Sequence, residues 1–118
     1  MTKIASLTIA VVAASLALIS CAPSAGAACG SDDECLEEQE CLTNFKGGYC
    51  GIKDCEGDDD CPSDTQCVSH EGSNYCFLRC VDKAECNAER PADAEANCSS
   101  NIERVGDSSD KACVPPAG

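Results

Sequence analysis

Cysteine and carboxylate side chains carry most of the chemical potential of this 118-residue chain, which holds 13 cysteines, 21 acidic residues and one histidine. Acidic residues gather between cysteines in two similar stretches, CGSDDEC at 29–35 and CEGDDDC at 55–61. Thiolates bind zinc and carboxylate oxygens bind calcium, so both stretches are candidate metal sites. The same residues also suit a disulfide-bonded turn whose acids face water.

The spacing of these residues disfavours both metals. Zinc sites usually take two thiolates from one turn, in a Cys-x2-Cys pair or a similarly close one. The closest pair here is Cys76 and Cys80, with three residues between them. The acidic stretches lack the calcium-loop register, in which ligands alternate, a glycine makes the turn and a distal acid closes the site. We therefore expect solvated acidic turns and no cofactor, and we leave calcium binding open.

The first 20 residues differ from the rest of the chain. Lys3 precedes an apolar and small-residue run over 4–19, which is the form of a secretory signal and is shorter than the roughly 20 apolar residues of a spanning helix. The run ends in Leu18-Ile19-Ser20-Cys21, which resembles the bacterial lipobox. That resemblance implies a lipid on Cys21 as the new N-terminus. The alternative is cleavage after Ala27, at a small-x-small site.

Either cleavage leaves twelve cysteines, and an even set in an exported chain predicts a disulfide framework. The chain has only two Phe, two Tyr and no Trp, which is too little apolar surface for a core that offsets chain entropy. A bridge that closes a loop of about 15 residues contributes about 3 kcal/mol by restricting the unfolded chain. We expect bridges to replace much of the missing core.

The cysteines fall into a repeat. CGSDDECLEEQECLTNFKGGYC at 29–50 and CEGDDDCPSDTQCVSHEGSNYC at 55–76 share cysteine gaps of five, five and eight, with a Tyr before the fourth cysteine. Such self-similarity indicates a duplicated unit. A diverged third unit at 80–113 has gaps of five, eleven and fourteen. The joints GIKD and FLR are so short that the units should form a short rod or a compact stack.

The last gap of each of the first two units predicts a hairpin, because Gly-Gly in LTNFKGGY and Gly-Ser-Asn in VSHEGSNY allow a tight turn. In the third unit, RPADAEAN predicts one or two helical turns with Pro91 at the first position. The expected fold class is small and disulfide-rich: three tandem four-cysteine modules of turns and short β-hairpins, with little helix, after an N-terminal signal segment. The expected divisions are a signal peptide at 1–20, a lipidated cysteine and linker at 21–28, and repeats at 29–50, 55–76 and 80–113.

Four cysteines allow three pairings, and spacing alone does not choose among them. We expect first-to-third and second-to-fourth pairing within each unit and leave pairing between repeats open. The expected bridges are Cys29–Cys41, Cys35–Cys50, Cys55–Cys67, Cys61–Cys76, Cys80–Cys98 and Cys86–Cys113.

CGSDDEC and CEGDDDCPSDTQC resemble the start of the N-terminal cysteine-rich region of the Dickkopf family. The resemblance covers 29–50 and 55–76 well and 80–113 poorly. The chain lacks the adjacent Cys-Cys pair and the basic run of that family, so action on Wnt co-receptors is not carried over. The units also resemble short tandem modules of secreted, cysteine-rich bacterial lipoproteins, which implies a location rather than a reaction.

Catalysis is not expected, and the chain is predicted not to be an enzyme. His70 stands alone, and we expect it to be solvent-exposed at a hairpin tip. The paired carboxylates lack an enclosed cleft that would separate their pKa values. CFLRC at 76–80 could present Leu78 and Arg79 to a protease on a disulfide-braced loop. The favoured interpretation is that FLR joins two units, with Phe77 and Leu78 packed.

A formal net charge of −13 argues against binding to nucleic acid or to an anionic lipid surface. We expect an exported, lipid-anchored envelope protein with a structural or protein-binding role, an unidentified protein ligand and a membrane attachment through Cys21. In such lipoproteins the absence of Asp after the lipidated cysteine is associated with the outer membrane. The alternative is a secreted protease inhibitor or toxin-like effector that presents the Leu78-Arg79 loop.

Overall fold

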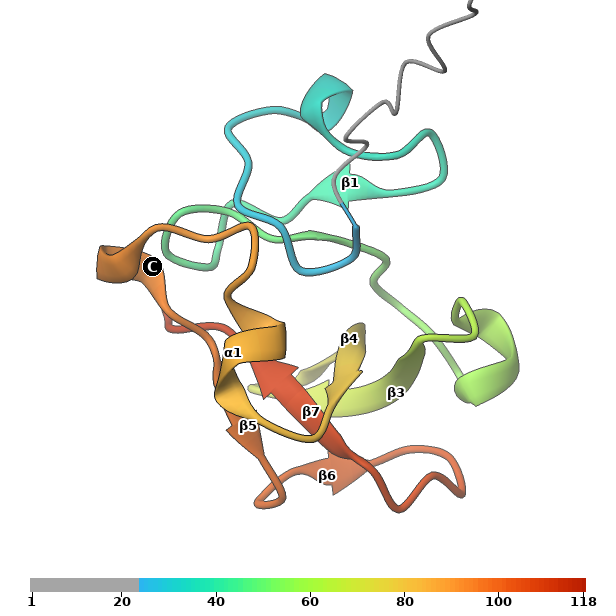
Figure 1. Ribbon diagram of the computed structural model, residues 1–118. Coiled ribbons are helices and arrows are strands. Elements are labelled where there is room, and N and C mark those ends of the chain that lie inside the picture. The colour runs from blue at the N-terminus through green and yellow to red at the C-terminus, as the bar shows by residue number, and fades with distance from the viewer. Residues whose placement is uncertain (1–23) are drawn as a thin grey trace, which may run out of the picture.

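The computed structural model describes residues 24–118, and the predicted signal segment and Cys21 lie outside them (Figure 1). Turns and short strands make up most of this range, and the single α-helix has four residues, which confirms the expected fold class. In chain order the elements are η1 (Asp32–Glu34), β1 (Glu40–Cys41), β2 (Cys50–Gly51), η2 (Asp58–Asp60), β3 (Thr65–His70), β4 (Ser73–Cys80), α1 (Lys83–Cys86), η3 (Ala92–Ala94), β5 (Asn97–Ser99), β6 (Glu103–Arg104) and β7 (Lys111–Val114), where η marks a 3-10 turn.

The strands form two antiparallel sheets. In the first unit, β1 and β2 make a two-stranded sheet that lies above the rest of the molecule in Figure 1. The other strands make one five-stranded sheet in the order β5-β7-β4-β3-β6. The second and third units therefore share a sheet and are not separate ribbons, because β7 of the third unit pairs with β4 of the second.

The β3–β4 hairpin has the tight turn that its sequence predicts, but one residue earlier. His70 pairs with Ser73, so Glu71 and Gly72 form a two-residue turn with positive φ angles of 50° and 85°. In the first unit a longer loop joins β1 to β2. Gly48 has a φ of 74° there, and a Cβ would lie 2.1 Å from the carbonyl oxygen of Cys29, so only glycine fits.

One apolar cluster joins all three units. It contains every Phe and Tyr of the chain together with three aliphatic residues: Leu42, Phe45, Tyr49, Val68, Tyr75, Phe77 and Ala112. The ring centroids of Phe45 and Tyr75 are 5.1 Å apart, and those of Tyr49 and Phe77 are 5.4 Å apart. The tyrosine before the fourth cysteine of the first two units is thus a core residue, and the three units form a compact stack.

All twelve cysteines from Cys29 onward are paired, and the pairing is first-to-third and second-to-fourth within each unit, which confirms the expectation. The bridges are Cys29–Cys41, Cys35–Cys50, Cys55–Cys67, Cys61–Cys76, Cys80–Cys98 and Cys86–Cys113.

The helical turns of the third unit differ from the prediction in position and type. The stretch RPADAEAN forms the single 3-10 turn η3, and Pro91 precedes that turn with an extended backbone. The α-helix α1 lies earlier, within the first cysteine gap. It begins with a capping box in which Asp82 accepts from the Glu85 N–H and Glu85 accepts from the Asp82 N–H.

Candidate functional site

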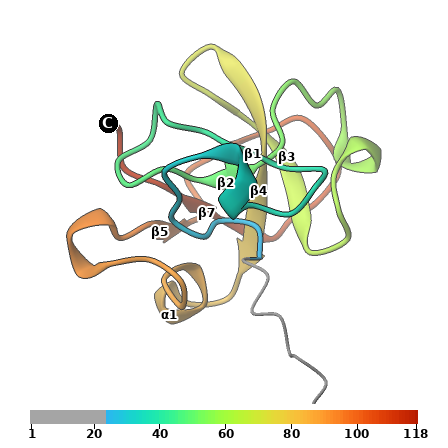
Figure 2. The same cartoon turned by 90° about the horizontal axis from the view of Figure 1, so that it is seen from above.

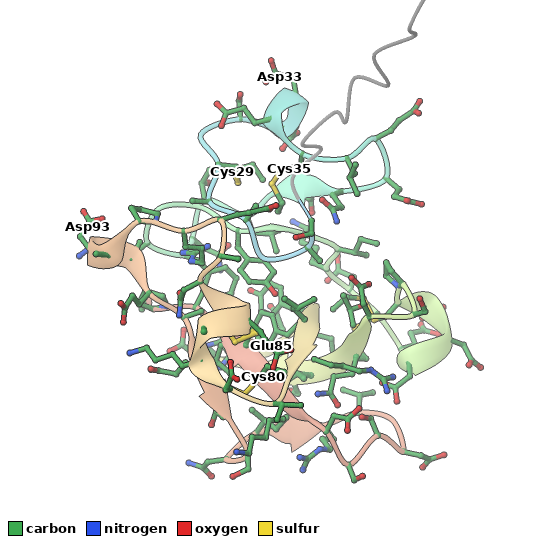
Figure 3. The ribbon with its side chains drawn as sticks, in the orientation of Figure 1. Cys29, Asp33, Cys35, Cys80, Glu85 and Asp93 are labelled. Atoms are coloured by element: carbon green, nitrogen blue, oxygen red, sulfur yellow. A yellow bond between two sulfur atoms is a disulfide. The ribbon has the colours of Figure 1, made fainter. Side chains whose placement is uncertain are left out.

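The last acid of the first cysteine gap has the same hydrogen bond in every unit. Its carboxylate accepts from the backbone N–H of the residue that follows the first cysteine. The donor and acceptor pairs are Gly30 and Glu34 at 3.0 Å, Glu56 and Asp60 at 2.8 Å, and Val81 and Glu85 at 3.0 Å. This carboxylate closes the turn between the first two cysteines, as Glu85 does beside Cys80 in Figure 3.

A second acid in each of the two acidic turns accepts a hydrogen bond from the backbone N–H of the third cysteine of its unit. Asp32 accepts from the Cys41 N–H at 2.8 Å, and Asp58 accepts from the Cys67 N–H at 2.9 Å. The third unit has Lys83 at the matching position. The turns are solvated as expected, since no residue of η1 or η2 is buried, and their acids also accept backbone hydrogen bonds. Only the middle acids stay free of backbone contacts, and Asp33 points outward from the first unit (Figure 3).

The described part of the chain brings metal-binding atoms together only at cysteines. Three groups have their ligand atoms within 4.8 Å of one another, one in each unit: Cys29, Cys35 and Cys50; Cys55, Cys61 and Cys67; Cys80, Cys86 and Cys98. Each of these sulfurs is in a disulfide and offers no thiolate to a metal. Neither acidic turn gathers three carboxylates in this way within residues 24–118.

The segment FLR joins two units with Phe77 and Leu78 packed, as the favoured interpretation has it, and it is part of the strand β4, whereas the alternative required a loop. Leu78 pairs with Thr65 of β3, Arg79 pairs with Ala112 of β7, and Phe77 between the cysteines is fully buried. The Arg79 guanidinium lies 3.2 Å from Asp110 and also donates to the Thr65 carbonyl. A protease could not take up this backbone, because its hydrogen-bonding edges are already occupied by neighbouring strands.

His70 is the last residue of β3, and it is half-buried. Its ring centroid lies 6.1 Å from that of Phe45 and 5.8 Å from that of Phe77. The expectation of a solvent-exposed histidine at a loop tip is therefore wrong, because the turn begins one residue later and the imidazole rests on the aromatic cluster. This contact gives His70 a packing role.

Within residues 24–118, Arg90 is the one basic residue among the buried polar side chains, with 9 % of its surface exposed. Its guanidinium donates four hydrogen bonds, all to main-chain carbonyl oxygens. The acceptors are Ala94 at 2.7 Å, Gly26 at 3.1 Å, Gly48 at 2.7 Å and Lys46 at 2.7 Å. These carbonyls belong to the third unit, the first unit and the segment before it, so Arg90 ties the three together.

Arg90 also lies over the ring of Tyr49, 5.9 Å from its centroid. Tyr49 is fully buried, and its hydroxyl oxygen accepts from the Leu78 N–H at 3.0 Å. Burial raises the pKa of the Tyr49 phenol well above its usual range. Burial also lowers the pKa of the Arg90 guanidinium, which stays charged because an arginine starts so high.

The residues before Cys29, expected to be a linker, are packed into the fold. Ala25 and Ala27 are buried. The Gly26 N–H donates to the Cys50 carbonyl and the Cys50 N–H donates to the Ala27 carbonyl, each at 2.9 Å. Ser24 donates to Glu89 from its backbone N–H at 2.9 Å and from its hydroxyl at 3.2 Å. The segment 24–27 therefore lies between the first and third units.

The surface of the second unit carries an open polar hollow of about 310 Å³. It is lined by the β3–β4 turn and by the start of the acidic gap: Asp54, Cys55, Glu56, Gly72, Ser73 and Asn74. The Asn74 amide donates to the Cys55 carbonyl across its floor at 2.8 Å. A partner that binds here would meet carboxylates and backbone and little apolar surface.

Residues 24–118 contain no helix with the length and hydropathy to cross a membrane. Comparison of the chain with protein-family models, with curated proteins and with solved structures gave no match.

Proposed function

We propose that the protein is an exported, lipid-anchored envelope protein whose disulfide-bonded domain has a structural or protein-binding role and no catalytic one. The observation that carries this proposal is the packing of Ser24–Ala27 into the fold. It separates the two cleavage sites that the sequence offers, because one of them would remove packed residues and the other would not.

Cleavage after Ala27 would remove the two buried alanines and five hydrogen bonds to the rest of the domain. Two are exposed bonds from Ser24 to Glu89, two join the segment to Cys50, and one runs from Arg90 to the Gly26 carbonyl. At about 1 kcal/mol for each of the three that involve buried residues, the loss is roughly 3 kcal/mol before the apolar contacts are counted. Cleavage before Cys21 retains every one of these contacts. The fold therefore favours Cys21 as the mature N-terminus.

The six bridges support export, because disulfides form and persist in oxidising compartments such as the periplasm and the cell surface. The role without catalysis is supported by the surroundings of the candidate groups. His70 rests on aromatic rings, and the acids of the turns accept backbone hydrogen bonds. The polar hollow of the second unit is the surface we propose for a protein ligand.

Intact-mass analysis of the mature protein tests the proposal. The expected product begins at Cys21, carries a diacylglyceryl group and has all twelve remaining cysteines oxidised. The variant Cys21→Ala should lose the lipid and the membrane association, whereas Ser20→Ala, which keeps a small residue before the cysteine, should retain both. An unmodified chain that begins at Ala28 and is released into the medium would refute the lipid anchor and favour the secreted alternative.

A further inference from the structure

We propose that the domain is held directly against the lipid headgroups by the edge that bears Ser24 and α1, and that the β3–β4 turn and the polar hollow face away from the membrane. This inference rests on the proposed function, since it requires the lipid on Cys21. It follows from the place where the packed part of the chain begins.

The tether from Cys21 to the packed domain is very short. Three residue steps separate Cys21 from Ser24, and a fully extended chain spans about 3.6 Å per step, so the two Cα atoms are at most about 11 Å apart. If the chain were free as far as Cys29, as the sequence suggested, eight steps would allow about 29 Å. A headgroup layer is roughly 5–8 Å thick, because a bilayer of about 40–45 Å has a hydrocarbon core of about 30 Å. Most of the tether is therefore used in crossing the headgroups.

The packed segment is fixed from two sides and does not lengthen the tether. Ser24 is bonded to Glu89 of the third unit, and Gly26 is bonded to Cys50 of the first unit and to the Arg90 guanidinium. The segment 24–27 lines a cavity of only about 10 Å³ together with Leu78 and the end of α1, so it lies close to this helix. Residues near Ser24 consequently stay within reach of the headgroups, however the domain tilts about that point.

The two edges of the molecule are well separated. Figure 2 shows the described chain entering, in blue, at the same edge as α1, whereas the β3–β4 turn lies at the opposite edge. Ala88 and Glu89 lie beside Ser24, and Glu56 lies beside Gly72 in the hollow. Both edges carry acids and no basic cluster, so the tether, and not attraction to anionic lipid, would hold the contact.

A single tryptophan can report this orientation, because the chain has none of its own. Ala88→Trp and Glu56→Trp both replace exposed residues, one at each edge. The lipidated proteins are reconstituted in phosphatidylcholine vesicles that carry a nitroxide on the headgroup. Emission of Ala88→Trp should be strongly quenched and that of Glu56→Trp almost unchanged, because the label lies at the membrane surface and only the first edge is held against it. Ser24→Trp is a second reporter for the membrane edge and should behave like Ala88→Trp.

An inserted spacer is the matched control. About ten Gly and Ser residues between Pro23 and Ser24 add a span of roughly 17 Å and should reduce the quenching of Ala88→Trp to the level of Glu56→Trp. Equal quenching at both edges, in a protein shown by mass to be lipidated and by flotation to be vesicle-bound, would overturn the orientation and leave the proposed function standing. Absence of the lipid, or failure to float, would instead refute the proposed function itself.

Discussion

Replacement of Arg90 by alanine should destabilise the domain more than any other single change of a charged residue in the described chain. The guanidinium is buried and satisfies four carbonyl oxygens, on Gly26, Lys46, Gly48 and Ala94. Among the turn and loop hydrogen bonds of residues 24–118, no backbone N–H donates to any of these four oxygens. Alanine leaves all four without a donor.

The expected loss follows from these contacts. A buried acceptor left unsatisfied costs about 1–3 kcal/mol, and the lower figure applies where water can enter the vacated space, so four carbonyls give about 4 kcal/mol. For a domain of this size that lowers the thermal midpoint by roughly 15–30 °C. Arg90→Lys keeps the charge but reaches fewer carbonyls at once, and it should lose roughly half as much.

Unfolding in urea, monitored by circular dichroism with the bridges intact, measures the change. Arg104→Ala is the matched control, because Arg104 also donates only to main-chain carbonyls, those of Ser109 and Asp110, but does so at the surface. That control should lose less than about 1 kcal/mol. If the two alanine variants are equally stable, Arg90 does not hold the units together and the argument from its burial is wrong.

Three further outcomes are expected. Asp58→Asn should lower the unfolding free energy by about 1 kcal/mol, because a charged acceptor of the Cys67 N–H becomes neutral, whereas Asp59→Asn should change it by less than about 0.5 kcal/mol; urea unfolding of both compares them directly. Above about pH 10 the Tyr49 phenol loses its proton in the unfolded chain and keeps it in the folded domain, where it is buried. The unfolding free energy should therefore fall by about 1.4 kcal/mol per pH unit because of this residue, and Tyr49→Phe should abolish that slope. Complete reduction and alkylation should abolish the near-ultraviolet dichroism of the aromatic cluster, and retention of that signal would show that the bridges are dispensable.

Local features of the sequence predicted much of this fold. The gaps of five, five and eight residues define the units, and each unit closes its own two bridges with sequence separations of 12 and 15 in the first two. The first two units also share a tyrosine before the fourth cysteine, and both tyrosines lie in the apolar cluster. The repeat and the hairpin turn are visible in the sequence because each is contained in a short stretch of one unit.

Contacts between units were not predictable in the same way. FLR is too short to show a strand period by itself, and Ala112, with which Arg79 pairs, lies far away in the sequence in the third unit. The burial of Arg90 depends on four carbonyl oxygens, and an arginine in a polar stretch has no pattern that distinguishes it from a surface residue. The start of α1 is an exception, because the D-x-x-E pattern at 82–85 is a capping-box signature contained in four consecutive residues. Lipidation of Cys21 stays a prediction.

The position of β7 has a consequence for how the chain matures. Among the described strands this one comes last in the chain, yet it lies between β4 and β5, and Cys113 within it closes the bridge to Cys86. Until β7 is added, β4 and β5 lack the neighbour that joins them, and Cys86 lacks its partner sulfur. A chain cut before Lys111 would therefore keep an incomplete sheet and a reactive thiol at Cys86.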